Sequence, residues 1–252
     1  MKYVLVTLLS LVLNVGLIAN TNAQDLKSEE NAGKNNIEQR DTFSYNGMTL
    51  QYMLVLPADY SRIDRPWPMI LFLHGGSGRG QNLDLVKSYG PPLIAEEQKD
   101  FPFVVLAPQC PEEETWTTKA DILAALLDDV IKKYKIDPDR VYLTGTSMGG
   151  NGTWHLVARH PGYFAAVAPM AASPEIPDIW NKRFISMPIW AFHGDQDTIC
   201  PLTDDEAMIN ALRAQGASPR FTVLHGKGHY IGKEAYENRD LYDWFLETTR
   251  QH

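Results

Sequence analysis

Three residue types that together perform nucleophilic catalysis occur along this chain in the order serine, aspartate, histidine. Ser147 lies in the glycine-rich run GTSMGG, Asp197 in HGDQDTICP and His229 in GKGH. A serine hydroxyl is a weak nucleophile, so it needs a neighbouring base, and that base needs a group that orients it. The order predicts that Ser147 is the nucleophile, His229 the general base and Asp197 the acid that orients the base.

The glycines around Ser147 indicate a sharp turn between a strand and a helix. An apolar run, VYLTG at 141–145, precedes the serine, and a helix-like segment at 148–159 follows it. In such a turn the serine takes a strained backbone conformation that lifts its hydroxyl clear of the sheet. Gly145 and Gly149 stand where a side chain would have no room, so we interpret the pattern as a nucleophile-bearing elbow and not as an ordinary turn.

The acid and the base each have a neighbour that could take the same role. Asp195 directly follows Gly194 and is expected to shape the turn through a hydrogen bond to the backbone. Asp197 lies two residues further into the loop, where its carboxylate can reach a histidine. His225 belongs to a strand end, whereas His229 lies in a loop before the last helix. We therefore favour Asp197 and His229.

Two backbone N–H groups should stabilise the oxyanion that forms when the serine attacks a carbonyl group. One is expected from the residue after the nucleophile, Met148, and the other from the loop after an early strand. The run LFLHGGSGRG at 71–80 fits that loop, and we expect Gly76 to be the second donor, with Gly75 as the alternative. No Lys-Ser or Lys-Thr pair follows these glycines, which argues against a phosphate-binding loop.

Three other histidines are expected to have structural roles. His155 lies within the helix that follows the elbow, and His160 lies at the end of that helix, before Pro161. His193 ends a strand and precedes a turn glycine. None of the three occupies the position in a loop that a general base needs.

Strand-like and helix-like segments alternate along most of the chain, which predicts βαβ units around a mostly parallel sheet of about eight strands. The later strands are continuous apolar runs, as expected of strands that helices cover on both faces. The first two strands should form a hairpin around Asn46-Gly47. The expected strands are 41–46, 48–56, 69–74, 103–108, 141–145, 165–170, 189–194 and 221–226. The expected helices are 119–134, 148–159, 204–215 and 234–249.

The N-terminus has the features of an export signal. Lys2 is followed by a short, mostly apolar run, and the small residue Ala23 ends the region. No basic stop-transfer cluster flanks the run, so we expect a signal peptide at 1–23 and not a membrane anchor. Residues 24–40 are polar and predict a mobile leader. One catalytic domain at 41–252 then remains, in a periplasmic or secreted protein.

The charge balance and the missing motifs exclude several function classes. The chain carries 31 acidic and 23 basic residues, for a formal net charge of −8. Because no basic stripe is visible, nucleic acid and anionic membrane surfaces are poor candidates for partners. No P-loop and no dinucleotide-binding glycine motif occurs after a strand, so no nucleotide cofactor is expected. The triad needs neither a metal ion nor a cofactor.

The chain contains two cysteines, Cys110 and Cys200. Each precedes a proline just after an expected strand. In an exported protein two cysteines can form one disulfide, but the sequence leaves open whether these two meet.

Taken together, these motifs resemble those of the α/β-hydrolase superfamily. The segments 136–171 and 107–116 further resemble its exported esterase branch, which includes feruloyl and acetyl xylan esterases, polyester-depolymerase-like proteins and prolyl-oligopeptidase-like predicted peptidases. The resemblance covers about residues 41–250. The motifs that carry it, in this order and spacing, are HGG (74–76), GTSMGG (145–150), HGDQDTICP (193–201) and GKGH (226–229).

The resemblance implies an α/β-hydrolase fold and the same catalytic serine, aspartate and histidine, with Gly76 and Met148 around the oxyanion. It also implies that Trp116 lies near the substrate, although an ordinary aromatic residue covering the core is an equally good reading of that position. The family more often has an aliphatic residue where this chain has Cys200, which raises the question of what that side chain contacts.

The short spacing between two late strands indicates an open site. Only residues 171–188 separate the strand before the acid-bearing strand from that strand, which is too few for a large cap domain. An uncapped site suits esters carried on a polymer, so we expect a serine ester hydrolase acting on feruloyl or acetyl esters of plant-polysaccharide type. The alternatives are a prolyl-oligopeptidase-like serine peptidase and a non-catalytic binding protein with a hydrolase fold.

Overall fold

One eight-stranded sheet forms the centre of the protein. The structure, a computed structural model, describes residues 36–175 and 182–250. Within the sheet the strands lie in the order β1-β2-β4-β3-β5-β6-β7-β8. They are β1 (Ile37–Tyr45), β2 (Met48–Leu56), β3 (Trp67–Leu73), β4 (Val104–Gln109), β5 (Ile136–Thr146), β6 (Ala166–Met170), β7 (Trp190–Gly194) and β8 (Arg220–Leu224).

The sheet is mostly parallel, as the alternating pattern predicts. In the sheet order, the strands β4, β3, β5, β6, β7 and β8 pair in parallel. The strand β2 pairs antiparallel, with β1 and with β4. The β1–β2 hairpin turns at Asn46 and Gly47, which both have positive φ angles, 49° and 77°. This is the left-handed geometry that an Asn-Gly hairpin turn requires.

The first strand begins earlier than the sequence predicts. Residues 37–40, which we expected at the end of a mobile leader, form the first half of β1 and pair with residues 53–56 of β2. Their side chains are exposed because β1 is an edge strand, so the segment carries no apolar pattern that would distinguish it from a leader. Residues 1–23 and 24–35, where we expect the signal peptide and the rest of the leader, lie outside the described residues.

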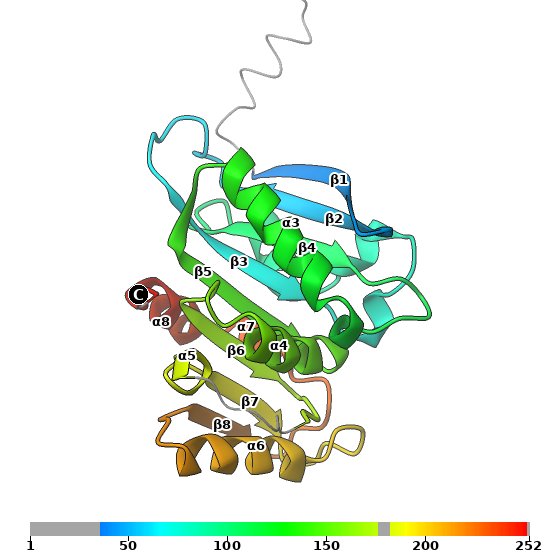
Figure 1. The fold of residues 1–252 in the computed structure, drawn as a ribbon, viewed down its shortest axis with the longest axis vertical. Coiled ribbons are helices and arrows are strands. Elements are labelled where there is room, and N and C mark those ends of the chain that lie inside the picture. Colours follow the sequence, from blue (N-terminus) through cyan, green and yellow to red (C-terminus); the bar gives the residue numbers. More distant parts are fainter. Residues whose placement is uncertain (1–35, 176–181, 251–252) are drawn as a thin grey trace, which may run out of the picture. The chain divides into compact units, whose positions relative to one another are not determined.

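Helices cover both faces of the sheet (Figure 1). In that view α3, α4 and α6 lie in front of the strands and α8 lies behind them. The α-helices are α2 (Pro91–Glu97), α3 (Ala120–Lys133), α4 (Met148–Arg159), α5 (Lys182–Ile185), α6 (Leu202–Ala214), α7 (Gly232–Tyr236) and α8 (Arg239–Glu247). The described residues also form the short 3₁₀ helices η1 (Gly76–Gly78), η2 (Leu83–Lys87) and η3 (Trp116–Thr118).

Two buried apolar clusters, one on each face, hold these layers together. One cluster joins the sheet to α3, α4 and α6 through residues such as Leu126, Trp154 and Met208. The other joins it to α2, α7 and α8 through residues such as Ile94 and Phe245. Because both faces are covered, every residue of β3 and β4 is buried, which explains their continuous apolar sequences.

The last predicted helix, 234–249, is two helices in the structure. Between α7 and α8, Asn238 takes an extended conformation and its side chain accepts a hydrogen bond from the Asp240 amide. An asparagine in this role caps a new helix, which ends the previous one. The expected buried stripe of Leu241, Trp244 and Phe245 is confirmed on α8.

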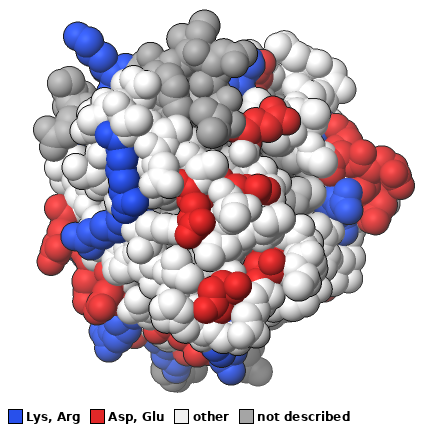
Figure 2. Space-filling model, turned by 90° about the horizontal axis from the view of Figure 1, so that it is seen from below, with Lys and Arg blue, Asp and Glu red and all other residues white. Residues whose placement is uncertain are grey.

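The surface carries charges of both signs. Figure 2 shows that, on the face seen there, basic (blue) and acidic (red) side chains lie in small separate groups among uncharged residues. In the part of the chain that the structure describes, no helix combines the length and apolar character needed to cross a membrane.

Candidate active site

Ser147 occupies a strained turn between β5 and α4. Its backbone angles are φ 57° and ψ −120°, in a region that non-glycine residues rarely adopt. The Ser147 amide donates to the carbonyl oxygen of Met170 on β6, over 2.9 Å, which fixes the turn to the neighbouring strand. The predicted elbow is confirmed, and its strain is stabilised by the surrounding sheet.

The two flanking glycines are required by close approach of backbone to backbone. A methyl group on Gly149 would lie 1.8 Å from the carbonyl oxygen of Leu73, and one on Gly145 would lie 2.5 Å from the carbonyl oxygen of Gly149. Backbone atoms at these positions cannot move aside without opening the β3–β5 pair. The sequence therefore correctly predicts that neither position has room for a side chain.

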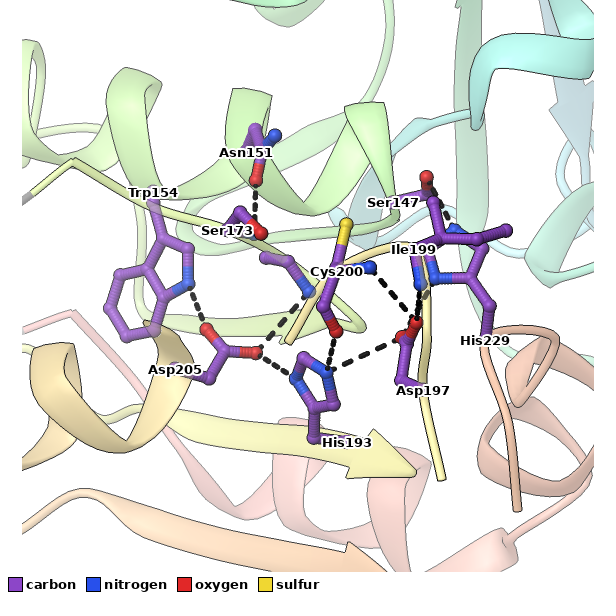
Figure 3. Close-up of polar contacts among 11 residues, drawn as sticks. Ser147, Asn151, Trp154, Ser173, His193, Asp197, Ile199, Cys200, Asp205 and His229 are labelled. Atoms are coloured by element: carbon purple, nitrogen blue, oxygen red, sulfur yellow. Dashed lines mark hydrogen bonds and ion pairs between the residues drawn. The ribbon is translucent and has the colours of Figure 1, made fainter. Parts of the chain in front are cut away.

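The three triad residues are in hydrogen-bond contact, although they lie far apart in the sequence (Figure 3). His229 Nε2 lies 2.7 Å from Ser147 Oγ, and His229 Nδ1 lies 2.7 Å from Asp197 Oδ2. Because Asp197 accepts the Nδ1 proton, Nε2 carries the lone pair that can take the serine proton. The residues that we favoured as nucleophile, base and acid therefore have the geometry of a catalytic triad.

Asp197 is held as a buried carboxylate. Besides His229, it accepts hydrogen bonds at Oδ1 from the amides of Ile199 (2.8 Å) and Cys200 (2.9 Å). Burial alone would raise the pKa of Asp197, but the hydrogen bonds from His229 and from these two amides outweigh it and lower the pKa below its usual value. The carboxylate thus stays ionised and fixed in direction.

The alternative acid and base form a separate pair at the surface. His225 Nδ1 lies 2.9 Å from Asp195 Oδ2, and the His225 side chain is 88% exposed. Asp195 also accepts a hydrogen bond from the amide of Gly226, over 2.7 Å. Asp195 therefore shapes a turn, as the sequence predicts. The turn is the one after β8, however, and not the turn after β7 in which Asp195 itself lies.

The oxyanion donors expected from the sequence lie beside the nucleophile. Met148 and Gly76 are the first residues of α4 and η1, and the amides at a helix start have no partner within the helix. The alternative donor, Gly75, already donates to the Tyr89 hydroxyl over 2.7 Å. This contact favours Gly76 over Gly75.

Trp116 does not line the substrate site, so its assignment as a substrate-binding residue is wrong. It is 1% exposed, and its indole N–H donates to the carbonyl oxygen of His74 over 2.9 Å. Its ring also packs edge-on against the His74 ring, at 4.9 Å between centroids. The indole buries its apolar ring in the core and satisfies its one donor there, which leaves nothing to face a substrate.

His74 holds in place the loop after β3 that contains Gly75 and Gly76, called the oxyanion loop, a role that the sequence did not predict. The Cys110 amide donates to His74 Nε2 (3.0 Å), so the ring proton is on Nδ1, which donates to the Gly75 carbonyl oxygen (2.6 Å). Burial lowers the pKa of His74 to about 4, so the ring stays neutral. The only sequence feature that could have indicated this role is the position of His74 directly before Gly75 and Gly76.

Tyr89 joins the oxyanion loop to the elbow. Its hydroxyl accepts from the Gly75 amide and forms a hydrogen bond with Thr146 Oγ1 over 2.7 Å. No periodicity or motif in the sequence distinguishes this tyrosine. Its role depends on a contact across 57 residues of chain.

Ser147 lies at the junction of two cavities. The first has a volume of about 460 Å³ and is lined by the oxyanion loop, by the base and by the apolar side chains of Tyr89, Ile199 and Tyr230. The second, of about 1020 Å³, extends past Met148 and Asn151 along α4 and is more polar. Together they give room for groups on both sides of a scissile bond.

The two cysteines are free thiols and both are buried, so the disulfide that the sequence left open does not form. Cys200 contacts the site through its backbone. Its amide donates to Asp197, and its carbonyl oxygen faces His193 Nε2 at 2.9 Å. Among the described residues, no group of three or more His, Cys, Asp or Glu is placed to hold a metal ion.

The mostly parallel sheet, the strained elbow and the Ser-His-Asp contacts define an α/β-hydrolase. The chain belongs to the dienelactone hydrolase family, whose model matches residues 94–240. It is also 29% identical over 184 residues to a bifunctional acetylxylan esterase/xylanase from Neocallimastix patriciarum, covering 70% of this chain and 26% of that protein. The chain spans half or less of the length of the curated relatives that it matches.

Solved structures of esterases share this fold. A thermostable esterase superposes with a TM-score of 0.75 at 26% identity, covering 87% of this chain and 64% of that chain. The feruloyl esterase module from Clostridium thermocellum, complexed with sinapinate, superposes with a TM-score of 0.69 at 17% identity, covering 87% of this chain and 91% of that chain. The predicted fold class is confirmed.

Replacing Gly149 by alanine should destabilise the protein by about 3 kcal/mol or more, because the added methyl group collides with the β3 backbone. Gly228→Ala is the matched control, since its nearest neighbour would lie 3.6 Å away. Thermal unfolding followed by circular dichroism measures both. Equal unfolding midpoints in the two variants would contradict the packing argument.

Replacing Tyr89 by phenylalanine removes the hydroxyl that joins the oxyanion loop to the elbow but keeps the ring. We expect kcat to fall about 10-fold, because the Gly76 donor loses its fixed position, while the unfolding midpoint changes little. Steady-state kinetics on an activated ester measures this effect. Retention of the wild-type kcat would show that the loop is positioned without Tyr89.

Proposed function

We propose that this protein is an exported serine ester hydrolase that acts through an acyl-enzyme on feruloyl or acetyl esters of plant-polysaccharide type. The observation that carries the proposal is the contact of Ser147 Oγ with His229 Nε2 at 2.7 Å, with the base held by Asp197, at the junction of two open cavities. The acetylxylan esterase and feruloyl esterase names of its relatives support the substrate class.

The first half of the reaction forms the acyl-enzyme. Ser147 Oγ attacks the ester carbonyl carbon while its proton passes to His229 Nε2, and Asp197 stabilises the resulting imidazolium. The carbonyl oxygen becomes an oxyanion that accepts hydrogen bonds from the amides of Gly76 and Met148. The tetrahedral intermediate then collapses, and His229 returns the proton to the departing alcohol oxygen.

The second half regenerates the enzyme. A water molecule gives a proton to His229 Nε2 as its oxygen attacks the acyl carbon, and the same two amides stabilise the second oxyanion. Collapse breaks the bond to Ser147 Oγ, which regains the proton from His229, and the carboxylic acid leaves. The cycle consumes one ester and one water and yields one acid and one alcohol.

The rim of the first cavity favours an acyl ester carried on a large molecule. Tyr230 and Ile199 line this cavity and are 87% and 58% exposed, respectively. Lining the same cavity beside the nucleophile, these two side chains offer an apolar surface to a ligand. An aromatic acyl group can pack against these two side chains, while the open site leaves room for the polysaccharide that carries it.

Release of free acid from a natural polymer tests this proposal. Acetylated and feruloylated arabinoxylan is incubated with the wild type and with Ser147→Ala, and chromatography quantifies acetate, ferulate and p-coumarate. We expect the wild type to release at least one acid, and the variant to lose about 10⁴-fold or more of the rate because no other nucleophile is in place.

A second substrate separates the outcomes. If the wild type hydrolyses 4-nitrophenyl acetate but releases no acid from arabinoxylan, the polysaccharide assignment is wrong and the esterase assignment stands. If peptide amides are cleaved in place of esters, the protein is the serine peptidase that the sequence allows as an alternative.

A further inference from the structure

Behind the catalytic acid lies a second histidine–aspartate pair that the triad does not use. His193, at the end of β7, and Asp205, in the first turn of α6, are both fully buried. His193 Nδ1 lies 2.7 Å from Asp205 Oδ2. A buried pair of ionisable groups is costly to maintain unless every polar atom is satisfied, so the partners of each atom decide its state.

Asp205 faces only hydrogen-bond donors. Its Oδ1 accepts from the Trp154 indole N–H at 3.0 Å, and its Oδ2 accepts from the Ala172 amide at 3.3 Å and from His193. Burial raises the pKa of Asp205, which taken alone would favour a neutral carboxyl group. We assign the proton that the pair shares to His193 because the other two neighbours of the carboxylate, the Trp154 and Ala172 N–H groups, only donate and so stabilise its ionised form.

His193 faces only hydrogen-bond acceptors. Its Nδ1 faces Asp205, and its Nε2 faces the Cys200 carbonyl oxygen at 2.9 Å and Asp197 Oδ2 at 3.3 Å. An imidazole with acceptors at both nitrogens satisfies them only as the doubly protonated imidazolium. Burial lowers the pKa of His193, but the hydrogen bonds to Asp205 and Cys200 outweigh it and the net direction is upward.

The contacts connect this pair directly to the nucleophile (Figure 3). They run from Asp205 through His193 to Asp197 Oδ2, the same oxygen that His229 contacts. Asp205 and His193 together carry no net charge, which lowers the cost of burial, but the positive member is the one that faces Asp197. The other titratable groups near the pair are the buried Cys200 thiol and the partly exposed Asp204.

We propose that His193, protonated and held by Asp205, is a positioning residue that fixes the catalytic carboxylate Asp197 toward the base. The inference rests on the proposed function, because it needs the triad to act in ester hydrolysis. A cation beside Asp197 favours the ionised form of this carboxylate. Asp197 therefore stays ionised, and the triad intact, at lower pH.

Two variants separate position from charge. His193→Gln removes the cation and the ring nitrogen that contacts Asp197. Asp205→Asn lets the asparagine amide donate to His193 Nδ1, so that a neutral ring keeps an Nε2 proton facing the Cys200 carbonyl oxygen and Asp197. Asp204→Asn removes the same formal charge from the neighbouring, partly exposed position of α6 and is the matched control.

The readout is the pH dependence of kcat and KM on 4-nitrophenyl acetate, expressed per active site titrated with a fluorophosphonate. For His193→Gln we expect kcat to fall about 10- to 100-fold with KM within about twofold of the wild type. For both variants we expect the acid limb of kcat/KM to move up by about half a pH unit. Asp204→Asn should match the wild type.

A wild-type measurement keeps the test independent of how well the variants fold. In ¹⁵N-histidine-labelled protein at about pH 8, where ordinary histidines are neutral, we expect NMR to detect one histidine that carries protons on both nitrogens. The absence of any such histidine would overturn the proposal.

The kinetic outcomes are also decisive. Variants with wild-type kcat per titrated site and an unmoved acid limb would overturn this proposal while leaving the proposed function intact. A wild type without activity on any ester would overturn the proposed function, and this inference with it.

Discussion

The close contact between the elbow and β3 is the constraint on which the site depends. Gly149 approaches the Leu73 carbonyl so closely that not even a methyl group fits between them. This contact places the start of α4 directly against the end of β3, where the oxyanion loop begins. The nucleophile and the two expected oxyanion donors are therefore positioned by one backbone packing arrangement, and the strain at Ser147 is stabilised by the two strands that flank β5.

The parallel strands bring the remaining triad members to the same place. Ser147, Asp197 and His229 each follow the carboxyl end of a strand, and such ends lie at one edge of a parallel sheet. The Asp197 carboxylate is buried behind the base and remains ionised because two backbone amides and His229 satisfy its oxygens. A buried charge held in this way keeps its direction, which the general base requires.

Most of the fold and the triad could be predicted from the sequence because local rules act there. Continuous apolar runs identify the buried strands, and the glycine spacing identifies the elbow. The rest depends on contacts between distant residues. Tyr89 acts through contacts that no motif marks, and His74 is marked only by its place before the glycines. Trp116 has a sequence context that fits a substrate site and the core equally well. The exposed start of β1 lacks any apolar pattern, so the sequence predicts a leader for its first four residues.

The role of His193 illustrates the same limit. From the sequence it is a strand-end histidine before a turn glycine, and a structural role is the natural expectation. Its partner Asp205 is twelve residues away on a helix, and the meaning of the pair depends on Asp197 lying on its other side. Only the three-dimensional structure brings these three side chains together.

Covalent labelling of the nucleophile tests the central claim most directly. Wild-type protein is treated with a fluorophosphonate, and peptide mass spectrometry locates and times the adduct, with His229→Ala as the comparison. The structure predicts a single adduct on Ser147 that forms about 10³-fold or more slowly when the base is removed. No adduct on Ser147, or equal rates in the two proteins, would contradict a triad in which His229 activates Ser147.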